Sequence, residues 1–128
     1  MTESTNNNAS LYERLGGWGV VNRASDSFYE KIITDPRVNY FFENVDMVVQ
    51  NNKMKLFFAH IFGGIPVKEG FSLRKTHVPL VEKGLNDSHF DIICEKMAEA
   101  LRENDVDAAL VTQVLEAFEK LRPEILNR

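Results

Sequence analysis

The residues of this sequence that could do chemistry gather between positions 50 and 77. Counted from Gln50, apolar side chains recur at the spacing of one helical face, at Met54, Phe57, Phe58 and Ile61. Lys53 lies on the same face. After a glycine pair that stops this helix, Ser72 can cap a short helix that carries His77. A polar-tipped apolar wall that faces a histidine is what a buried, flat cofactor needs.

Other kinds of site have weak support. The chain has three histidines and one cysteine, without a His-Glu-x-x-His or Cys-x-x-Cys pattern, so a dedicated zinc site is not favoured. The glycine pairs at 16–17 and 63–64 follow helical patterns and indicate helix stops rather than phosphate-binding loops. No Ser-His-Asp triad can be assigned from spacing. Cys94 lies in a helical apolar stripe and is expected to be buried filler; a reactive thiol is the alternative.

Length and composition indicate one globular domain. Of the 128 residues, 44% are hydrophobic and 27% charged, and the net charge is −4. No basic run exceeds Arg74-Lys75, so we expect no nucleic-acid or membrane partner. No apolar run approaches the roughly 18 residues of a spanning helix, and residues 2–9 lack the regions of a signal peptide. We therefore expect a cytoplasmic protein, with a disordered or frayed lead-in over 1–9 and a single domain over 10–128.

The hydrophobic pattern predicts an all-α chain with four substantial helices and two or three short ones. A capping box at Ser10–Glu13 starts a short helix. Asp35-Pro36 can start a second short one, which carries the aromatic cluster at 40–42. The substantial helices are expected over residues 19–34, over residues 47–62 behind an Asp46 cap, after the cap residues 86–88, and after residues 104–105.

Glycines and prolines set the remaining boundaries. Pro79 disfavours helical geometry at Val78, so the helix that carries His77 is expected to be short and to close at Gly84. Pro123 is expected to bend or fray the last helix. Residues 63–71 are predicted to form an ordered loop. No stretch alternates with period two for long enough to predict a strand.

The order of several short motifs resembles that of the truncated (2-on-2) haemoglobins of group I. The resemblance covers residues 10–128 and implies an all-α, truncated globin-like 2-on-2 helical sandwich around a haem. The motifs are Leu11-Tyr12-Glu13-Arg14-Leu15-Gly16-Gly17, Phe28-Tyr29-Glu30, Asp35-Pro36-Arg37, Phe41-Phe42, Asn44-Val45-Asp46-Met47, Phe62-Gly63-Gly64, the segment that ends at His77, and His89-Phe90-Asp91.

The resemblance gives roles to four residues. His77 matches the proximal histidine that ligates haem iron, where the residues alone also allow a surface or satisfied core histidine. Tyr29 matches the distal tyrosine whose hydroxyl donates to a gas ligand; a core tyrosine with a backbone partner is the alternative. Gln50 matches a polar distal position, or is a solvated helix start. Phe42 matches the phenylalanine that packs on the porphyrin, a role compatible with ordinary core packing.

Lys53 has two interpretations. Its stem can cover apolar surface while the ammonium reaches solvent or a haem propionate. Alternatively, it ligates the iron as a neutral amine when no gas is bound, as the resemblance allows. Removing the proton of a lysine with a reference pKa of about 10.4 costs roughly 4.6 kcal/mol at pH 7. An iron–amine bond and the desolvation of the pocket can offset that cost.

The other expected haem contacts are peripheral. Phe57, Phe90, Ile93 and Met97 are predicted to line the haem, and Arg74 with Lys75 to contact the propionates or to form a solvated basic pair. His60 is expected at the pocket rim and His89 without an iron role. Met54 stands where many relatives have glutamine. The last helix has no histidine at 118–122, where some relatives bond the haem covalently, so non-covalent haem b is expected.

The resemblance implies a monomeric haem protein that binds O2 and NO and acts as a nitric oxide dioxygenase, with Tyr29 and Gln50 holding the oxygen. Turnover then needs an external reductase or electron donor, because nothing in the sequence indicates a flavin or nicotinamide site. The alternative is a non-enzymatic oxygen binder, gas sensor or electron-transfer haem protein. A third possibility is a helical interaction module without a cofactor. Fold alone does not choose among these functions.

Overall fold

The structure is a computed structural model that describes residues 9–64 and 72–128. These residues form six α-helices and one 3-10 helix, without a strand, as predicted. The predicted lead-in up to residue 8 and the predicted loop over 65–71 lie outside the described residues. The elements are α2 (Leu11–Leu15), α3 (Trp18–Ile33), η1 (Asn39–Phe42), α4 (Met47–Ile61), α5 (Leu73–Glu82), α6 (Asp87–Glu103) and α7 (Ala108–Ile125).

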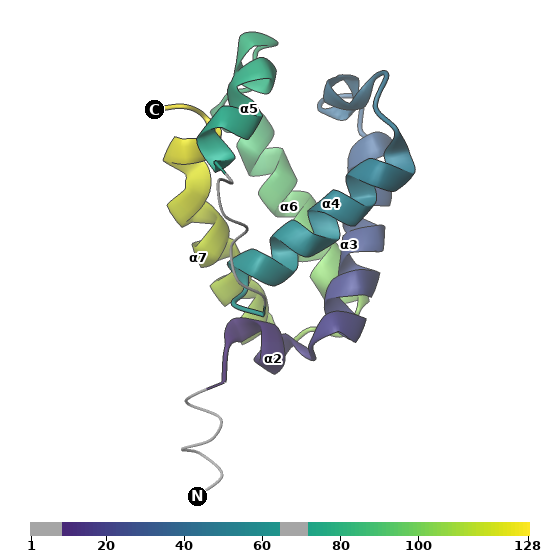
Figure 1. The fold of residues 1–128 in the computed structure, drawn as a ribbon. Coiled ribbons are helices and arrows are strands. Elements are labelled where there is room, and N and C mark those ends of the chain that lie inside the picture. Colours follow the sequence, from purple (N-terminus) through teal and green to yellow (C-terminus); the bar gives the residue numbers. More distant parts are fainter. Residues whose placement is uncertain (1–8, 65–71) are drawn as a thin grey trace, which may run out of the picture.

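The four long helices form two pairs. α3 packs against α4 and α6, and α6 packs against α7, so that the pair α3–α4 lies on the pair α6–α7 (Figure 1). α5 lies against α7. The core between the pairs is aromatic, with Phe58 in edge contact with Phe28 at 5.4 Å and stacked on Phe118 at 5.8 Å between ring centroids. No helix in the described ranges combines the length and apolar character that crossing a membrane requires.

Four predicted N-caps are confirmed. The side chains of Ser10, Asp46, Ser72 and Asn86 each accept a backbone N–H from the first turn of their helix. Each cap gives an otherwise unpaired amide a partner and fixes where its helix starts. The caps of α4 and α5 are therefore the local reason why the helices of Lys53 and His77 begin where they do.

Asp46 makes the cap with the largest expected effect on unfolding, because one carboxylate oxygen accepts from both Val48 N and Val49 N at 3.1 Å. We expect Asp46→Ala to lower the free energy of unfolding by about 1 kcal/mol, measured by urea denaturation of the apoprotein. Asp46→Asn should retain most of this stability, because an amide oxygen accepts the same bonds. An unchanged midpoint for the alanine variant would contradict the role of the cap.

Pro79 and Pro123 both lie inside helices, and the prediction that Pro79 disfavours helical geometry at Val78 is wrong. α5 passes through Val78 and Pro79 to Glu82, and α7 passes through Pro123 to Ile125 without a frayed end. A proline removes one backbone donor. In α5 the Pro79 carbonyl still accepts from Lys83 N at 3.2 Å, and after α7 the buried Leu126 continues the pattern by donating to Arg122 O at 3.0 Å.

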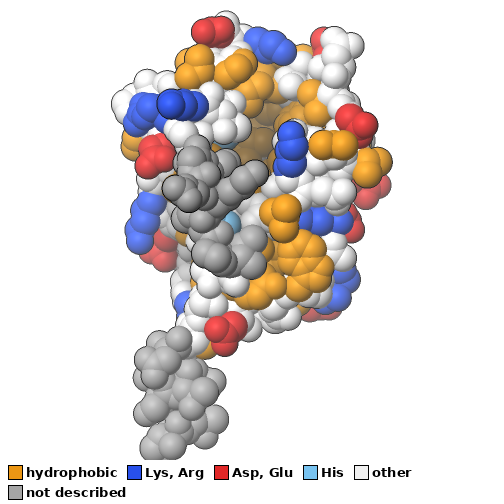
Figure 2. Space-filling model, viewed as in Figure 1, with side chains coloured by type: hydrophobic (Ala, Val, Ile, Leu, Met, Phe, Trp, Pro, Cys, Tyr) orange, Lys and Arg blue, Asp and Glu red, His pale blue; other side chains and the backbone are white. Residues whose placement is uncertain are grey.

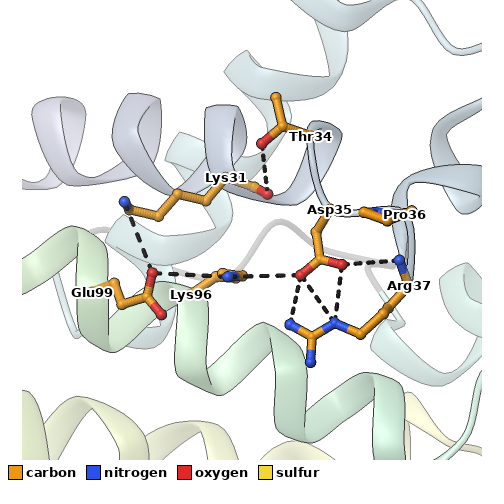
Figure 3. Close-up of a pocket in the computed structure, with 7 residues that line it drawn as sticks. All are labelled: Lys31, Thr34, Asp35, Pro36, Arg37, Lys96 and Glu99. Atoms are coloured by element: carbon orange, nitrogen blue, oxygen red, sulfur yellow. Dashed lines mark hydrogen bonds and ion pairs between the residues drawn. The ribbon is translucent and has the colours of Figure 1, made fainter.

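The turn after α3 also differs from the prediction, because η1 begins at Asn39 and not at Asp35-Pro36. The Asp35 carboxylate accepts the amide of Arg37 at 2.9 Å and its guanidinium at 2.6 Å, and this contact holds the pKa of Asp35 well below its usual range. Figure 3 shows Lys96 of α6 between Asp35 and Glu99, at 3.6 Å and 3.8 Å. These contacts fix the approach to η1 and so the place of Phe42.

The two glycines at the end of α4 have different roles: Gly63 ends the helix, and Gly64 lets Tyr12 of α2 pack closely. Gly63 has a φ of +88°, the left-handed conformation that ends a helix most easily in glycine. Gly64 lies against the ring of Tyr12, where a Cβ atom would come within 2.4 Å of the ring. Because Tyr12 N also donates to Phe62 O at 2.8 Å, α2 is docked on this end of α4. The predicted helix stop is confirmed, with α4 ending at Ile61.

Candidate haem site

A hollow opens on the face of the molecule where α4 stands opposite α5. Figure 2 shows that hydrophobic side chains line it and that Lys and Arg side chains border it. Several apolar residues of η1, α4, α5 and α6 pack on the core but keep exposed surface: Phe42, Met54, Phe57, Ile61, Leu80 and Ile93. An apolar recess of this kind suits a large, flat, apolar ligand.

The orientation and protonation of the His77 ring suit a metal ligand. It is the fifth residue of α5, and its Nδ1 lies 2.8 Å from the Leu73 carbonyl oxygen. A carbonyl only accepts, so Nδ1 carries the proton and donates, which leaves the lone pair of Nε2 free. Burial lowers the pKa of His77 and therefore favours the neutral imidazole. A neutral ring oriented by a backbone carbonyl is the usual state of a histidine that ligates a metal.

Tyr29 supplies a buried hydroxyl on α3. Its O–H donates to the thioether of Met47 at 3.0 Å, and its ring meets Phe42 edge to face at 6.1 Å. Burial, together with the nearby charge of Asp46, raises the pKa of Tyr29, so the phenol keeps its proton. Because a thioether is a weak acceptor, the hydroxyl can turn to a better partner. Sequence reasoning missed Met47, since nothing in its spacing distinguishes an acceptor from core filler.

Gln50 and Lys53 lie near the start of α4. Gln50 is partly buried and Lys53 is exposed, and within the described residues neither side chain has a hydrogen bond or an ion pair. Lys55, two positions further on, is different: its ammonium lies 2.9 Å from Asp26 of α3. Of the two lysines of α4, Lys53 is therefore the one whose ammonium no ion pair holds among the described residues.

The other residues predicted to contact the haem differ in how much of their surface is exposed. Phe90 and Met97 are buried within the protein itself, whereas Phe57 and Ile93 are partly exposed. Arg74 and Lys75 are both exposed, but the Arg74 guanidinium donates to the main-chain oxygen of Arg128 at 3.2 Å. Within the described residues the Lys75 side chain has no such partner, so it is the freer of the two predicted propionate contacts.

The remaining groups have structural surroundings. His89 Nδ1 accepts from Asn86 N at 3.0 Å, so its proton is on Nε2, which donates to the Tyr40 hydroxyl at 3.2 Å. Cys94 was expected to be buried, but it is only partly buried; this burial still raises the pKa of its thiol to about 11, which makes it a poor nucleophile. His60 is partly buried in the last turn of α4.

The described residues hold no group of three or more His, Cys, Asp or Glu side chains that could bind a metal ion by themselves. A haem brings four ligands of its own to the iron, so one free imidazole nitrogen is enough. His77 with its oriented ring, the apolar hollow and the Tyr29 hydroxyl together fit a haem.

Comparison with known proteins agrees with a haem site. Residues 10–127 match the family model of the bacterial-like globins, and the chain belongs to this family. A group 1 truncated hemoglobin, GlbN of Synechocystis sp., is 40% identical over 107 residues, which cover 83% of this chain and 86% of the relative. Another, from Tetrahymena pyriformis, is 32% identical over 121 residues, 93% of this chain and 96% of that one.

Solved structures show the same fold. The 2/2 hemoglobin from Synechococcus sp., in the cyanomet state and with covalently attached heme, has a TM-score of 0.87 and 42% identity, covering 94% of this chain and 100% of that one. The Fe(III) truncated hemoglobin of Tetrahymena pyriformis has a TM-score of 0.84 and 31% identity, covering 92% and 98%. The predicted group I resemblance and the 2-on-2 fold are confirmed. As a globin, this chain is a haem protein that binds small gas ligands such as O2.

Proposed function

We propose that this globin is a nitric oxide dioxygenase, which converts NO and O2 to nitrate with electrons from an external donor. The observation that carries the proposal is Tyr29, a buried residue of α3 whose hydroxyl has, among the described residues, only the thioether of Met47 as a hydrogen-bond partner. A bound haem b would supply the gas-binding, one-electron iron chemistry. His77 would hold it through Nε2, without a covalent bond, since residues 118–122 contain no histidine.

The distal side chains would retain the oxygen until NO arrives. The Tyr29 O–H exchanges a weak sulfur acceptor for a polar oxygen acceptor, and the Gln50 amide offers a second donor from α4. A hydrogen bond of this kind contributes about 1 to 1.4 kcal/mol, which slows gas release roughly five- to tenfold. We expect the protein to work as a monomer in the cytoplasm, with a separate reductase.

The test is the nitrate yield. Reduced protein equilibrated with O2 is mixed with NO in a stopped-flow instrument, and nitrate is measured against haem. We expect about one nitrate per haem within the mixing time, and a lower yield from Tyr29→Phe after a delay that lets oxygen escape. Tyr40→Phe is the matched control, because that hydroxyl contacts His89 and not Met47. If slow nitrate formation accompanies normal O2 binding, the protein is a non-enzymatic oxygen binder, sensor or electron carrier instead.

We further propose that Lys53 ligates the iron when no gas is bound. Its exposed ammonium lies one turn along α4 from Gln50, without an ion pair among the residues described. We expect the ferric protein to be low-spin and six-coordinate near neutral pH, and Lys53→Ala to be high-spin with bound water. Lys55→Ala, which removes the paired lysine of the same helix, should keep the wild-type spectrum. High-spin spectra from all three proteins would leave Lys53 as a charge at the rim.

A further inference from the structure

We infer that Asn127 is a positioning residue for His77: its side chain fixes the first turn of α5 and, through that turn, the direction of the imidazole. The inference rests on the proposed role of His77 as the haem ligand. The Asn127 amide donates to the Arg74 carbonyl at 3.2 Å, and the carbonyl of the preceding residue, Leu73, accepts from His77 Nδ1 at 2.8 Å. Two adjacent carbonyls of one helical turn thus connect Asn127 to the ring.

The backbone at the end of α7 explains why this position holds an asparagine. Arg128 N donates to Pro123 O at 2.8 Å and Asn127 N to Glu124 O at 3.3 Å, which is the Schellman pattern of helix ends. Asn127 occupies its left-handed position with a φ of +60°. Glycine adopts this conformation most easily. Asparagine also adopts this conformation, and unlike glycine it has a side chain that can donate a hydrogen bond. Here the Asn127 side chain donates to α5.

Residues 127–128, which contact α5, are also held to the start of α6. The Arg128 guanidinium contacts both oxygens of Asp87, the first residue of α6, at 2.8 Å each. Arg122 also reaches Asp87 at 3.0 Å, and its guanidinium carbon lies 4.4 Å from the centre of the Phe90 ring. Asp87 and Arg128 are about half exposed, and such ion pairs contribute little to global stability. Their consequence is geometric, because they hold residues 127–128 against the starts of both α5 and α6.

The direction of approach is also informative. α5 packs against α7, while its opposite side borders the hollow. Asn127 follows α7 and contacts the main chain of α5 at the Arg74 carbonyl. A support in this place can set the orientation of His77 without touching the haem.

The chain provides a matched control at the end of α6. Asp105 has a φ of +62°, and Val106 N donates to Leu101 O at 3.0 Å, so the same Schellman pattern occurs there. The Asp105 side chain has no hydrogen bond or ion pair among the described residues. Asn127→Gly and Asp105→Gly therefore relax the same backbone conformation, and only the first removes a contact to α5. Asn127→Asp keeps the side-chain shape but replaces the donor with an acceptor.

Two measurements test the inference. Hydrogen exchange of the Lys75 and Thr76 amides, which donate to the Ser72 cap in the first turn of α5, is followed in the apoprotein. The iron–histidine stretching band is recorded by resonance Raman spectroscopy of the reduced, haem-loaded protein, with Lys53→Ala in every variant so that the lysine cannot occupy the sixth position on the iron. For Asn127→Gly and Asn127→Asp we expect exchange about tenfold faster and a shifted or broadened band. Asp105→Gly should change neither.

The outcomes separate the inference from the proposed function. Unchanged exchange in α5 would overturn the inference, since the amide contact would then hold nothing. Faster exchange with an unchanged band would also overturn it, because the contact would be structural only. If the protein that carries Lys53→Ala alone shows no iron–histidine band at all, the proposed role of His77 fails and the inference falls with it.

Discussion

Replacing His77 with glycine is expected to weaken haemin binding by more than about 100-fold, and added imidazole should restore the absorption spectrum. Loss of groups that only orient a metal ligand costs 10- to 100-fold in affinity, and loss of the ligand itself should cost more. Imidazole can enter the space that the side chain leaves, because α5 borders the hollow. Titration of the apoprotein with haemin, followed by optical absorption, measures both effects.

His89→Asn is the control for this experiment. Its ring contacts Tyr40 and the amide of Asn86, so the variant should lose cap stability at the start of α6 but retain haemin affinity. If His77→Gly binds haemin as tightly as the wild type, with an unchanged spectrum, another residue is the iron ligand.

His77 should also make the stability of the apoprotein depend on pH. Burial lowers the pKa of His77 in the folded apoprotein, so the unfolded chain, with a pKa near 6.5, binds the proton more readily. Apoprotein stability should therefore fall as the pH drops below about 6.5 towards the folded-state pKa. Thermal unfolding at several pH values measures this, and His77→Gln should remove the part of the slope that belongs to this ring.

Removing the Tyr29 hydroxyl is the second change with a large expected effect. Tyr29→Phe should speed O2 release by roughly five- to tenfold, which corresponds to one hydrogen bond. Met47→Leu should act in the opposite direction and slow O2 release, because the hydroxyl then has no competing acceptor. Flash photolysis and rapid mixing give both rates. Equal rates in the wild type and both variants would show that Tyr29 does not contact the gas.

The sequence predicted well whatever depends on neighbouring residues. The caps at Asp46 and Ser72 follow from side chains that reach amides two or three residues away, and the helix stop at Gly63 follows from its left-handed backbone. The two-pair architecture was implied by the resemblance to the group I truncated haemoglobins, whereas the apolar stripes by themselves predicted only an all-α chain.

The sequence predicted poorly where distant residues decide the local structure. Val78 and Pro79 lie inside α5, where the Pro79 carbonyl still accepts from Lys83 N. The contact of Asn127 with α5 joins residues 53 positions apart, which no periodicity reveals. Likewise, only the folded chain shows that the Tyr29 hydroxyl meets Met47.

Cys94 is the single cysteine of the chain, and its thiol, with a pKa of about 11, is almost entirely protonated at pH 8. The thiolate fraction there is about one in a thousand, so maleimides and nitrosating agents should modify it very slowly. A cysteine introduced on an exposed helix face can therefore carry a fluorescent or spin label without first removing the native one. Label pairs on α4 and α5 would then report the width of the hollow in solution, with and without haem and gas.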